Sequence, residues 1–234
     1  MIKRKTFQKE QIAEMLQPFS KYMSAEQIEM LPTTCPVYEY GRDTYIYREG
    51  DVADNVFCII HGAAKLYMGD VGLQQQIMAL YKTGEYLGID SMCSQENHRS
   101  SCLAMTGAIV CHIPISFIQP IIYSHPDLMR YVLKRLSFQL IMSRLRYIRL
   151  TQKHMRGRLA DVLLQLVNWF GYESDGSTIS IELSREELAS IANMTTANAI
   201  RTLSAFADEK VITLNRRQIR IIDIKALLHI SRHD

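Results

Sequence analysis

The sequence has no apolar run long enough to cross a membrane. A bilayer-spanning helix needs roughly 18 consecutive apolar residues, and polar or charged residues interrupt every apolar stretch sooner than that. The first residues, MIKRKTFQKEQ, carry positive charges, but no apolar segment follows them, so they do not resemble a secretory signal peptide. We therefore expect a cytoplasmic protein with no membrane partner.

Paired cysteines are also lacking. The chain has five cysteines, all in its first half, and no two of them have the C-x-x-C spacing. An odd number without close pairs argues against a disulfide framework and against a structural zinc site, whose ligands usually come in close pairs. We expect no metal site, and reduced thiols that pack mostly as small hydrophobic side chains.

A strong net charge and the common catalytic motifs are missing as well. The formal net charge is +3, and residues 151–234 carry 11 Lys and Arg against 10 Asp and Glu, which leaves +1. Any contact with nucleic acid must therefore depend on where the charges lie. The sequence has no Walker loop, no G-x-S-x-G and no H-E-x-x-H, so it does not predict an enzyme.

The pattern of apolar and polar residues changes along the chain. Its 234 residues are enough for two compact domains or one large one. Residues 8 to 30 have a loosely amphipathic helical pattern. From about residue 33, short β-prone runs such as VYEYGRD and TYIYREGD alternate with Gly and Asp. Strands of this length at such regular spacing predict an antiparallel sandwich or barrel.

The pattern turns helical at about residue 114 and stays helical to about residue 150. Seven positions follow a 4-3-4-3 spacing, the heptad pattern of a helix that pairs with another helix. They are Met129, Leu133, Leu136, Leu140, Ser143, Tyr147 and Leu150. A second apolar stripe contains Phe138, Ile141, Met142, Leu145 and Ile148. We expect a homodimer with the heptad positions at its interface; burial of both stripes within one chain is the alternative.

The C-terminal third predicts short elements in quick succession. A helical segment, 151–170, leads through a turn-rich loop to a predicted strand, TISIEL (178–183). The stretch LSREELASIANMTTANAIRTL (183–203) predicts two short helices joined by a tight turn. VITLNRRQIRIID then alternates apolar residues around Asn-Arg-Arg, which predicts a hairpin. The last segment, IKALLHISRHD, predicts a short helix or a fraying tail.

Both short helices begin with residues that favour a helix N-terminus. Ser184, with Glu187 three residues later, forms a capping box, and Thr195 can cap the second helix. The inner side of the second helix, which anchors it, contains Ala199, Leu203, Phe206 and Ala207.

The opposite side of the second helix is small and polar. It contains Asn198, Arg201, Thr202 and Ala205, at i, i+3, i+4 and i+7. In the DNA major groove, Arg pairs with guanine, Asn with adenine, and Thr or Ala contacts the thymine methyl group. No His or Cys lies nearby to support catalysis. The expected base-reading residues are Thr195, Thr196, Asn198, Arg201 and Thr202; an ordinary solvated face is the alternative.

The surroundings of this helix strengthen the nucleic-acid interpretation. A strand before the helix pair and a hairpin after it are typical of a winged helix-turn-helix. Arg185, Arg216 and Arg217 flank the second helix, so we expect them to contact phosphates and to supply salt-dependent affinity. Solvated surface arginines are the alternative.

Six motifs, in this order, resemble the CRP/FNR family of bacterial transcription regulators. They are REGD (48–51), HG (61–62), GEYLG (84–88), HRSS (98–101), MRGRLADVLLQL (155–166) and the helix pair 183–203. The likeness covers nearly the whole chain. It implies an α+β fold in three parts. They are N-terminal helices with an antiparallel, jelly-roll-like β-roll similar to cyclic-nucleotide-binding domains (1–116), a long dimerisation helix (117–150) and a winged helix-turn-helix (151–234).

The resemblance also implies a function. Such a protein is a homodimeric, sequence-specific regulator controlled by a signal sensed in the β-roll; its partners are a pseudo-palindromic site in double-stranded DNA and RNA polymerase. Many relatives carry Arg-Glu where this chain has Thr196 and Ala197, whereas Arg201 matches a base-contacting Arg, so the operator should differ from theirs. A nucleotide-binding module that binds no DNA and a regulator that needs no effector are the alternatives.

The effector is not identified by these motifs. In relatives that bind cAMP, a cassette that begins with Gly-Glu and ends with Arg-Ser holds the cyclic phosphate. Gly88, Arg99 and Ser100 match it, but Ile89 stands where the ribose-binding Glu would be and cannot bond a 2′-hydroxyl. Ser143 lies at about the depth where those relatives contact the base. An Arg99–carboxylate pair and a Ser143 packing notch are the alternatives to ligand contacts.

The resemblance raises two further cofactors. Oxygen-sensing relatives hold an iron–sulfur cluster on closely spaced N-terminal cysteines; no cysteine precedes Cys35 here, so no such cluster is expected. Some relatives bind haem. Seven histidines, His61 and His98 among them, five cysteines and twelve methionines leave axial ligands available, although no motif marks them, so a haem-dependent redox sensor stays an alternative.

Overall fold

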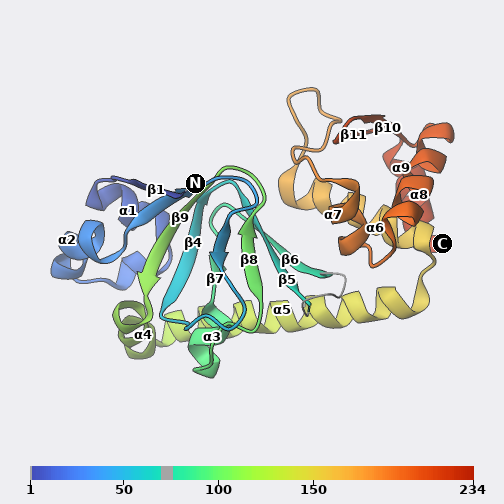
Figure 1. The fold of residues 1–234 in the computed structure, drawn as a ribbon. Coiled ribbons are helices and arrows are strands. Elements are labelled where there is room, and N and C mark those ends of the chain that lie inside the picture. Colours follow the sequence, from blue (N-terminus) through green and yellow to red (C-terminus); the bar gives the residue numbers. More distant parts are fainter. Residues whose placement is uncertain (1, 70–75) are drawn as a thin grey trace. The chain divides into compact units, whose positions relative to one another are not determined.

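The computed structural model of the protein describes residues 2–69 and 76–234. Its internal contacts divide the chain into two compact units, one with most of the chain up to Leu140 and one running from Ile141 to Asp234. Strands dominate the first unit and helices the second (Figure 1). The long helix α5 (Pro126–Gln152) contributes residues to both units.

Helical segments lie near the start of the first unit, as predicted for residues 8 to 30. They are α1 (Lys9–Met15), the 3-10 helix η1 (Phe19–Tyr22) and α2 (Ala25–Thr34). A capping box begins α2, because the Ser24 hydroxyl accepts from the Gln27 N–H at 3.2 Å and the Gln27 side chain accepts from the Ser24 N–H at 2.8 Å.

The β-prone runs form two sheets, which confirms the predicted β-rich domain. The first has the order β1-β2-β9-β4-β7 and the second β3-β8-β5-β6. The strands are β1 (Ile2–Lys5), β2 (Val37–Tyr40), β3 (Tyr45–Tyr47), β4 (Asn55–His61), β5 (Ala63–Met68), β6 (Gln76–Lys82), β7 (Tyr86–Leu87), β8 (Ser101–Ala104) and β9 (Ala108–Pro114). β4 and β9 pair antiparallel, with Cys58 opposite Cys111.

The sequence pattern does not predict β1. All four of its residues are exposed, so the strand lacks the alternation of apolar and polar residues that marks a half-buried strand. Its conformation follows from pairing with β2, where Arg4 lies opposite Tyr38.

Residues from both sheets form one buried core cluster. It includes Tyr47 of β3, Phe57 and Ile59 of β4, Cys102 of β8 and Val110 of β9. A second cluster lies where α1, η1 and the later helices pack on the first sheet, and there the rings of Phe19 and Tyr86 meet edge to face at 4.8 Å. Aliphatic side chains make up most of this second cluster.

The cysteines are free thiols, four of them buried and Cys93 exposed. Burial raises the pKa of the Cys58 thiol to about 12, and a buried thiol in apolar surroundings is unreactive. Four of the five thiols therefore pack as small buried groups, as expected, and Cys93 does not.

The single helix expected over residues 117–150 is corrected to two helices. The first, α4 (Ile115–Ser124), ends before His125, which has an extended backbone (φ −125°, ψ 106°), and α5 begins at Pro126. A residue that precedes proline disfavours the α-helical region, whereas proline itself is tolerated in a first helical turn. The predicted roles of the three parts, as effector domain, dimerisation helix and DNA-binding domain, stay predictions.

The second unit contains a helix cluster and a hairpin. Beyond α5 come α6 (Met155–Phe170), α7 (Arg185–Ile191), α8 (Thr196–Asp208), β10 (Ile212–Asn215), β11 (Gln218–Ile221) and α9 (Ile224–His233). The predicted hairpin is confirmed, and the last segment is a helix. α6 and α9 approach so closely that a Cβ on Gly157 would lie 2.6 Å from the carbonyl carbon of Asp234, so this contact requires a glycine.

The strand predicted at 178–183 does not form. Thr178 and Ile179 make only isolated bridges, to Arg220 and Tyr172 respectively. The reason is a turn just before them, where the Asp175 carboxylate accepts from the N–H groups of Ser177 and Thr178 at 2.9 and 2.8 Å. Within the described part of the chain, no helix combines the length and apolarity that a bilayer-spanning helix needs.

Candidate nucleic-acid interface and effector region

The two helices of the pair are held by the residues that the sequence predicts. The Ser184 hydroxyl accepts from the Glu187 N–H at 3.1 Å, and the Glu187 carboxylate accepts from the Ser184 N–H at 2.7 Å. The turn between the helices passes through Asn193, whose φ is +50°; asparagine tolerates this left-handed conformation better than most residues. Thr195 then caps α8 by accepting from the Asn198 N–H at 3.2 Å.

One side of α8 anchors it in the unit. Ala199, Leu203 and Phe206 are fully buried, as predicted, whereas Ala207 is only partly buried. Their positions recur at the three- and four-residue spacing of one helical face. The exposed residues of α8 lie away from this side.

The residues predicted to lie on the outward side of α8 are exposed to different degrees. Arg201 and Thr195 are exposed, whereas Thr196, Asn198 and Thr202 are partly exposed. Nη2 of Arg201 donates to Oδ1 of Asn198 at 2.5 Å. These two predicted base-reading side chains are thus brought together.

Sequence reasoning missed three residues on this side. Ala197, Ile200 and Ser204 are exposed, whereas Thr202 and Ala205 stand at the edge of the exposed face. An α-helix turns about 100° per residue. A helical-wheel projection with Ala199, Leu203 and Phe206 on the inner side would therefore have placed the three missed residues outside the core.

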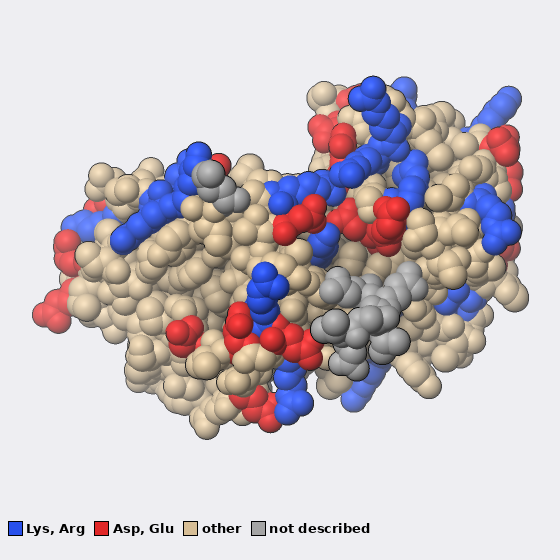
Figure 2. Space-filling view, in the orientation of Figure 1, with Lys and Arg blue, Asp and Glu red and all other residues tan. Residues whose placement is uncertain are grey.

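The predicted phosphate-contacting arginines differ in their surroundings. Arg216 and Arg217 are exposed at the tip of the β10–β11 hairpin, between Asn215 and Gln218. Arg185, at the start of α7, is only partly exposed, and its Nη2 donates to the Arg216 carbonyl at 3.0 Å. Figure 2 shows Lys and Arg gathered over the end of this unit that carries the hairpin, with Asp and Glu beside them.

Arg185 therefore links the first helix of the pair to the hairpin. Burial lowers the pKa of its guanidinium, and its Nη1 is buried without a hydrogen-bond partner in the described part of the chain. An unsatisfied buried donor is costly.

The residues of the predicted effector cassette do not form a joint anion cradle. Arg99 points into solvent with 76% of its side chain exposed, and it binds the Glu96 carboxylate through two hydrogen bonds of 2.7 and 2.9 Å. Ser100, the next residue, is buried, and so is Ile89. Gly88 has φ +78° and begins helix α3 (Ile89–Ser94). The Arg99–carboxylate alternative is the one that the geometry supports.

Aromatic and imidazole rings fill the region beside this cassette. His98 is 3% exposed, stacks on Tyr47 at 3.9 Å between ring centroids, and lies 3.2 Å from the Ser91 hydroxyl through Nδ1. Nε2 of His112 lies 2.7 Å from the Tyr40 hydroxyl. Burial lowers the pKa of both imidazoles, that of His112 to about 4.

These residues do not fit a cyclic nucleotide or a haem in this arrangement. A ribose needs a polar partner where the buried Ile89 side chain stands. A haem iron needs an imidazole or thiolate directed into open space, whereas His98 and His112 pack against neighbouring rings and His61 is exposed at the end of β4. No group of three or more metal-binding side chains was found among the described residues.

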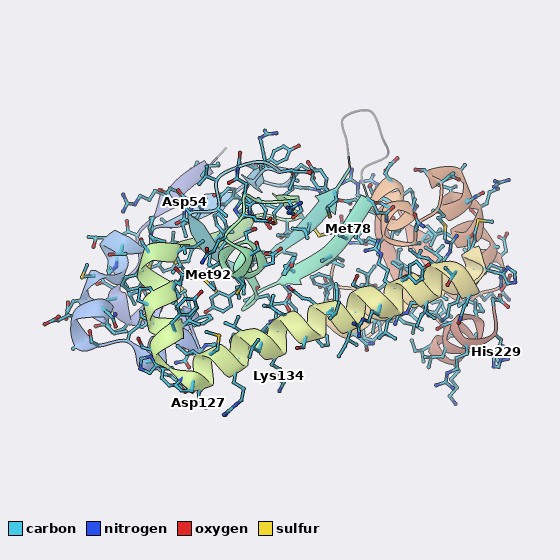
Figure 3. The ribbon with its side chains drawn as sticks, turned by 90° about the horizontal axis from the view of Figure 1, so that it is seen from below. Asp54, Met78, Met92, Asp127, Lys134 and His229 are labelled. Atoms are coloured by element: carbon cyan, nitrogen blue, oxygen red, sulfur yellow. The ribbon has the colours of Figure 1, made fainter. Side chains whose placement is uncertain are left out.

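Helix α5 presents large apolar side chains to solvent. Those of the heptad seam are Leu133, Leu140 and Tyr147, at 57%, 52% and 70% exposed, and those of the second stripe are Phe138, Ile141, Leu145 and Ile148, at 41–52%. Ser143 is exposed too, and Met129, Leu136 and Leu150 are partly exposed. In Figure 3, Asp127 and Lys134 point from α5 away from the strands. The structure of one chain therefore leaves much of both stripes exposed.

Two family models match the chain. The model for a cyclic nucleotide-binding domain matches residues 37–125, and the model for a Crp-like helix-turn-helix domain matches residues 157–230. The two matches cover the strand-rich part and the helix pair with its hairpin, in the order that the sequence motifs predict.

Individual proteins agree with this picture. The chain is 28% identical over 200 residues to the global nitrogen regulator of Synechococcus elongatus, covering 84% of this chain and 89% of that protein. It is 28% identical over 189 residues to the transcriptional regulatory protein Btr of Bordetella pertussis, covering 80% and 77%. Among solved structures, FixK2 from Bradyrhizobium japonicum matches with a TM-score of 0.76 at 20% identity, covering 84% and 97%, which shows the fold.

Proposed function

The chain belongs to the CRP/FNR family of DNA-binding transcription regulators, and from this premise we propose that it acts as a homodimer on a pseudo-palindromic operator under the control of a signal sensed in its β-rich unit. It is a regulator and not an enzyme. α8 enters the major groove, and the rest of the second unit holds it there.

The DNA contacts follow from the surface of the second unit. Arg201 is exposed and hydrogen-bonded to Asn198, which suits a guanidinium that pairs with a base edge. Thr195, Thr196 and Thr202 complete the predicted reading set. Arg216 and Arg217 extend from the hairpin tip, where they reach phosphates beside the groove. The salt dependence of binding comes mainly from these hairpin arginines.

Arg185 has a second role in this proposal. It ties the hairpin tip to α7 through the Arg216 carbonyl, so the helix pair and the hairpin meet the DNA as one rigid surface. Nη1 of Arg185 is buried, so a DNA phosphate would contact another part of this partly exposed guanidinium.

The homodimer rests on the exposed face of α5. Apolar side chains repeated every seven residues pair with their symmetry mates in a coiled coil, and leaving Leu133, Leu140 and Tyr147 in water is unfavourable. Two chains joined along α5 carry two copies of α8, which matches the two halves of a pseudo-palindrome.

The signal is proposed to be something other than a cyclic nucleotide. Ile89 is buried where a ribose would need a polar partner, and Arg99 is engaged by Glu96. Whatever the ligand is, it acts only through a different affinity for two arrangements of the dimer. The predicted contact with RNA polymerase and the predicted cytoplasmic location belong to the same proposal.

One observation carries this proposal: α8 is capped and anchored on one side while Arg201 and its neighbours face solvent on the other. Selection from a pool of random duplex DNA with the full-length protein tests it directly. We expect recovery of a two-fold symmetric motif with half-sites one helical turn apart, about 10–10.5 base pairs from centre to centre. Recovery of no symmetric motif would contradict the proposal.

A further inference from the structure

Ile200 is a large aliphatic side chain on the outward face of α8. It is 46% exposed, although the neighbouring Ala199 is fully buried. One residue along a helix turns the side chain by about 100°, so Ile200 leaves the core and joins the exposed Ala197, Arg201 and Ser204.

The chemistry of this face is apolar next to cationic. Ala197, one turn before Ile200, presents only a methyl group, and Ser204, one turn after it, is small. Because Ala197 and Ser204 are small, the Ile200 side chain extends further from the helix than either of them. A β-branched side chain has one strongly preferred χ1 rotamer in a helix, so Ile200 loses little conformational freedom when it meets a partner.

The major groove offers such a side chain one apolar feature. Among the four bases only thymine carries a methyl group at C5, and apolar side chains contact it there. The residues at the N-terminal end of a recognition helix reach the base edges, and Ile200 lies in the second turn of α8, which begins at Thr196.

We propose that Ile200, supported by the methyl group of Ala197, contacts the C5-methyl group of a thymine in each half-site and makes the operator specific for thymine at that position. The inference rests on the proposed function, since it assumes that α8 enters the major groove. It assigns the apolar part of base recognition to a side chain beside the hydrogen-bonding pair Asn198 and Arg201.

The experiment removes the methyl group from the DNA instead of from the protein. Each thymine of one half-site of the selected operator is replaced, one at a time, by deoxyuridine, which keeps every hydrogen-bonding group. Dissociation constants are measured by fluorescence anisotropy at fixed salt. At one position we expect deoxyuridine to weaken wild-type binding about 4-fold, the effect of losing one buried methyl group.

The variant Ile200→Ala tests the protein side of the same contact. It should bind the thymine operator more weakly than the wild type, and it should bind the thymine and deoxyuridine operators equally. Ile222→Ala is the matched control, because Ile222 is also an exposed isoleucine, at 50%, but lies outside α8; it should keep the wild-type discrimination. Arg201→Ala should weaken binding to both operators but should keep the wild-type discrimination between thymine and deoxyuridine.

Two results would overturn the inference. One is a wild-type protein that binds every deoxyuridine operator as tightly as the thymine operator; the other is an Ile200→Ala variant that still discriminates about 4-fold. In both cases the wild type still binds its operator, so the proposed function stands. If no operator is recovered at all, the proposed function itself fails.

Discussion

His112 shows what burial does to a single titratable side chain in this fold. Its imidazole lies 2.7 Å from the Tyr40 hydroxyl and near the ring of Tyr38, and desolvation lowers its pKa to about 4. In the unfolded chain a histidine titrates near about pH 6.5. Between these values the unfolded chain binds a proton that the folded chain does not.

Stability is therefore expected to fall as the solution becomes acidic. The contribution of His112 is complete above about pH 6.5, declines as the pH drops from 6.5 to 4, and changes no further below that, with a total on the order of 3 kcal/mol. Burial lowers the pKa of His98 as well, so it adds to the same decline.

Urea unfolding at several pH values, at one protein concentration, measures this effect. His112→Gln keeps a hydrogen-bonding side chain beside Tyr40 but cannot titrate, so its free energy of unfolding should change less between pH 6.5 and 4.5 than that of the wild type. Equal slopes for the two proteins would show that His112 is not responsible.

At the scale of an element, α5 carries two exposed apolar stripes on one helix, and only one of them is the predicted seam. Leu140 and Ile141 are adjacent in sequence and equally exposed, at 52% each, yet they lie on different stripes. Since the predicted seam contains Leu140, a charge there should break the dimer, whereas the same charge at Ile141 should be tolerated.

The matched variants are Leu140→Glu and Ile141→Glu, compared by light scattering at micromolar concentration. We expect a monomer for the first and a dimer for the second, because a carboxylate in a coiled-coil interface is desolvated without a partner. The reverse result would move the interface to the stripe of Phe138, Ile141, Leu145 and Ile148. Two unaffected dimers would remove α5 from the interface.

At the scale of the whole molecule, two copies of α8 must meet one duplex at a set spacing. Half a helical turn, about five base pairs, inserted between the half-sites turns one of them to the opposite side of the DNA. We expect affinity to fall to about that of an isolated half-site, measured by anisotropy with a single half-site duplex as the reference. Unchanged affinity would show that the two reading helices bind independently.

The sequence by itself determined a good part of this protein. Heptad spacing, capping residues and Gly-punctuated β-prone runs depend on neighbours within a few positions, so they predicted α8 with its cap at Thr195, the inner residues Ala199, Leu203 and Phe206, and the order of the parts. The family followed from motifs in that order.

Only the tertiary structure decided which side chains are free and which are engaged. Arg185 binds the hairpin tip across 31 residues of sequence, and His112 is buried beside Tyr40 across 72, and neither contact follows from spacing. β1 has no apolar pattern of its own and forms by pairing with β2, more than 30 residues further along the chain. The physical reason is that pairing, burial and ion pairs join residues distant in the chain, whereas helical periodicity and capping act within one or two turns.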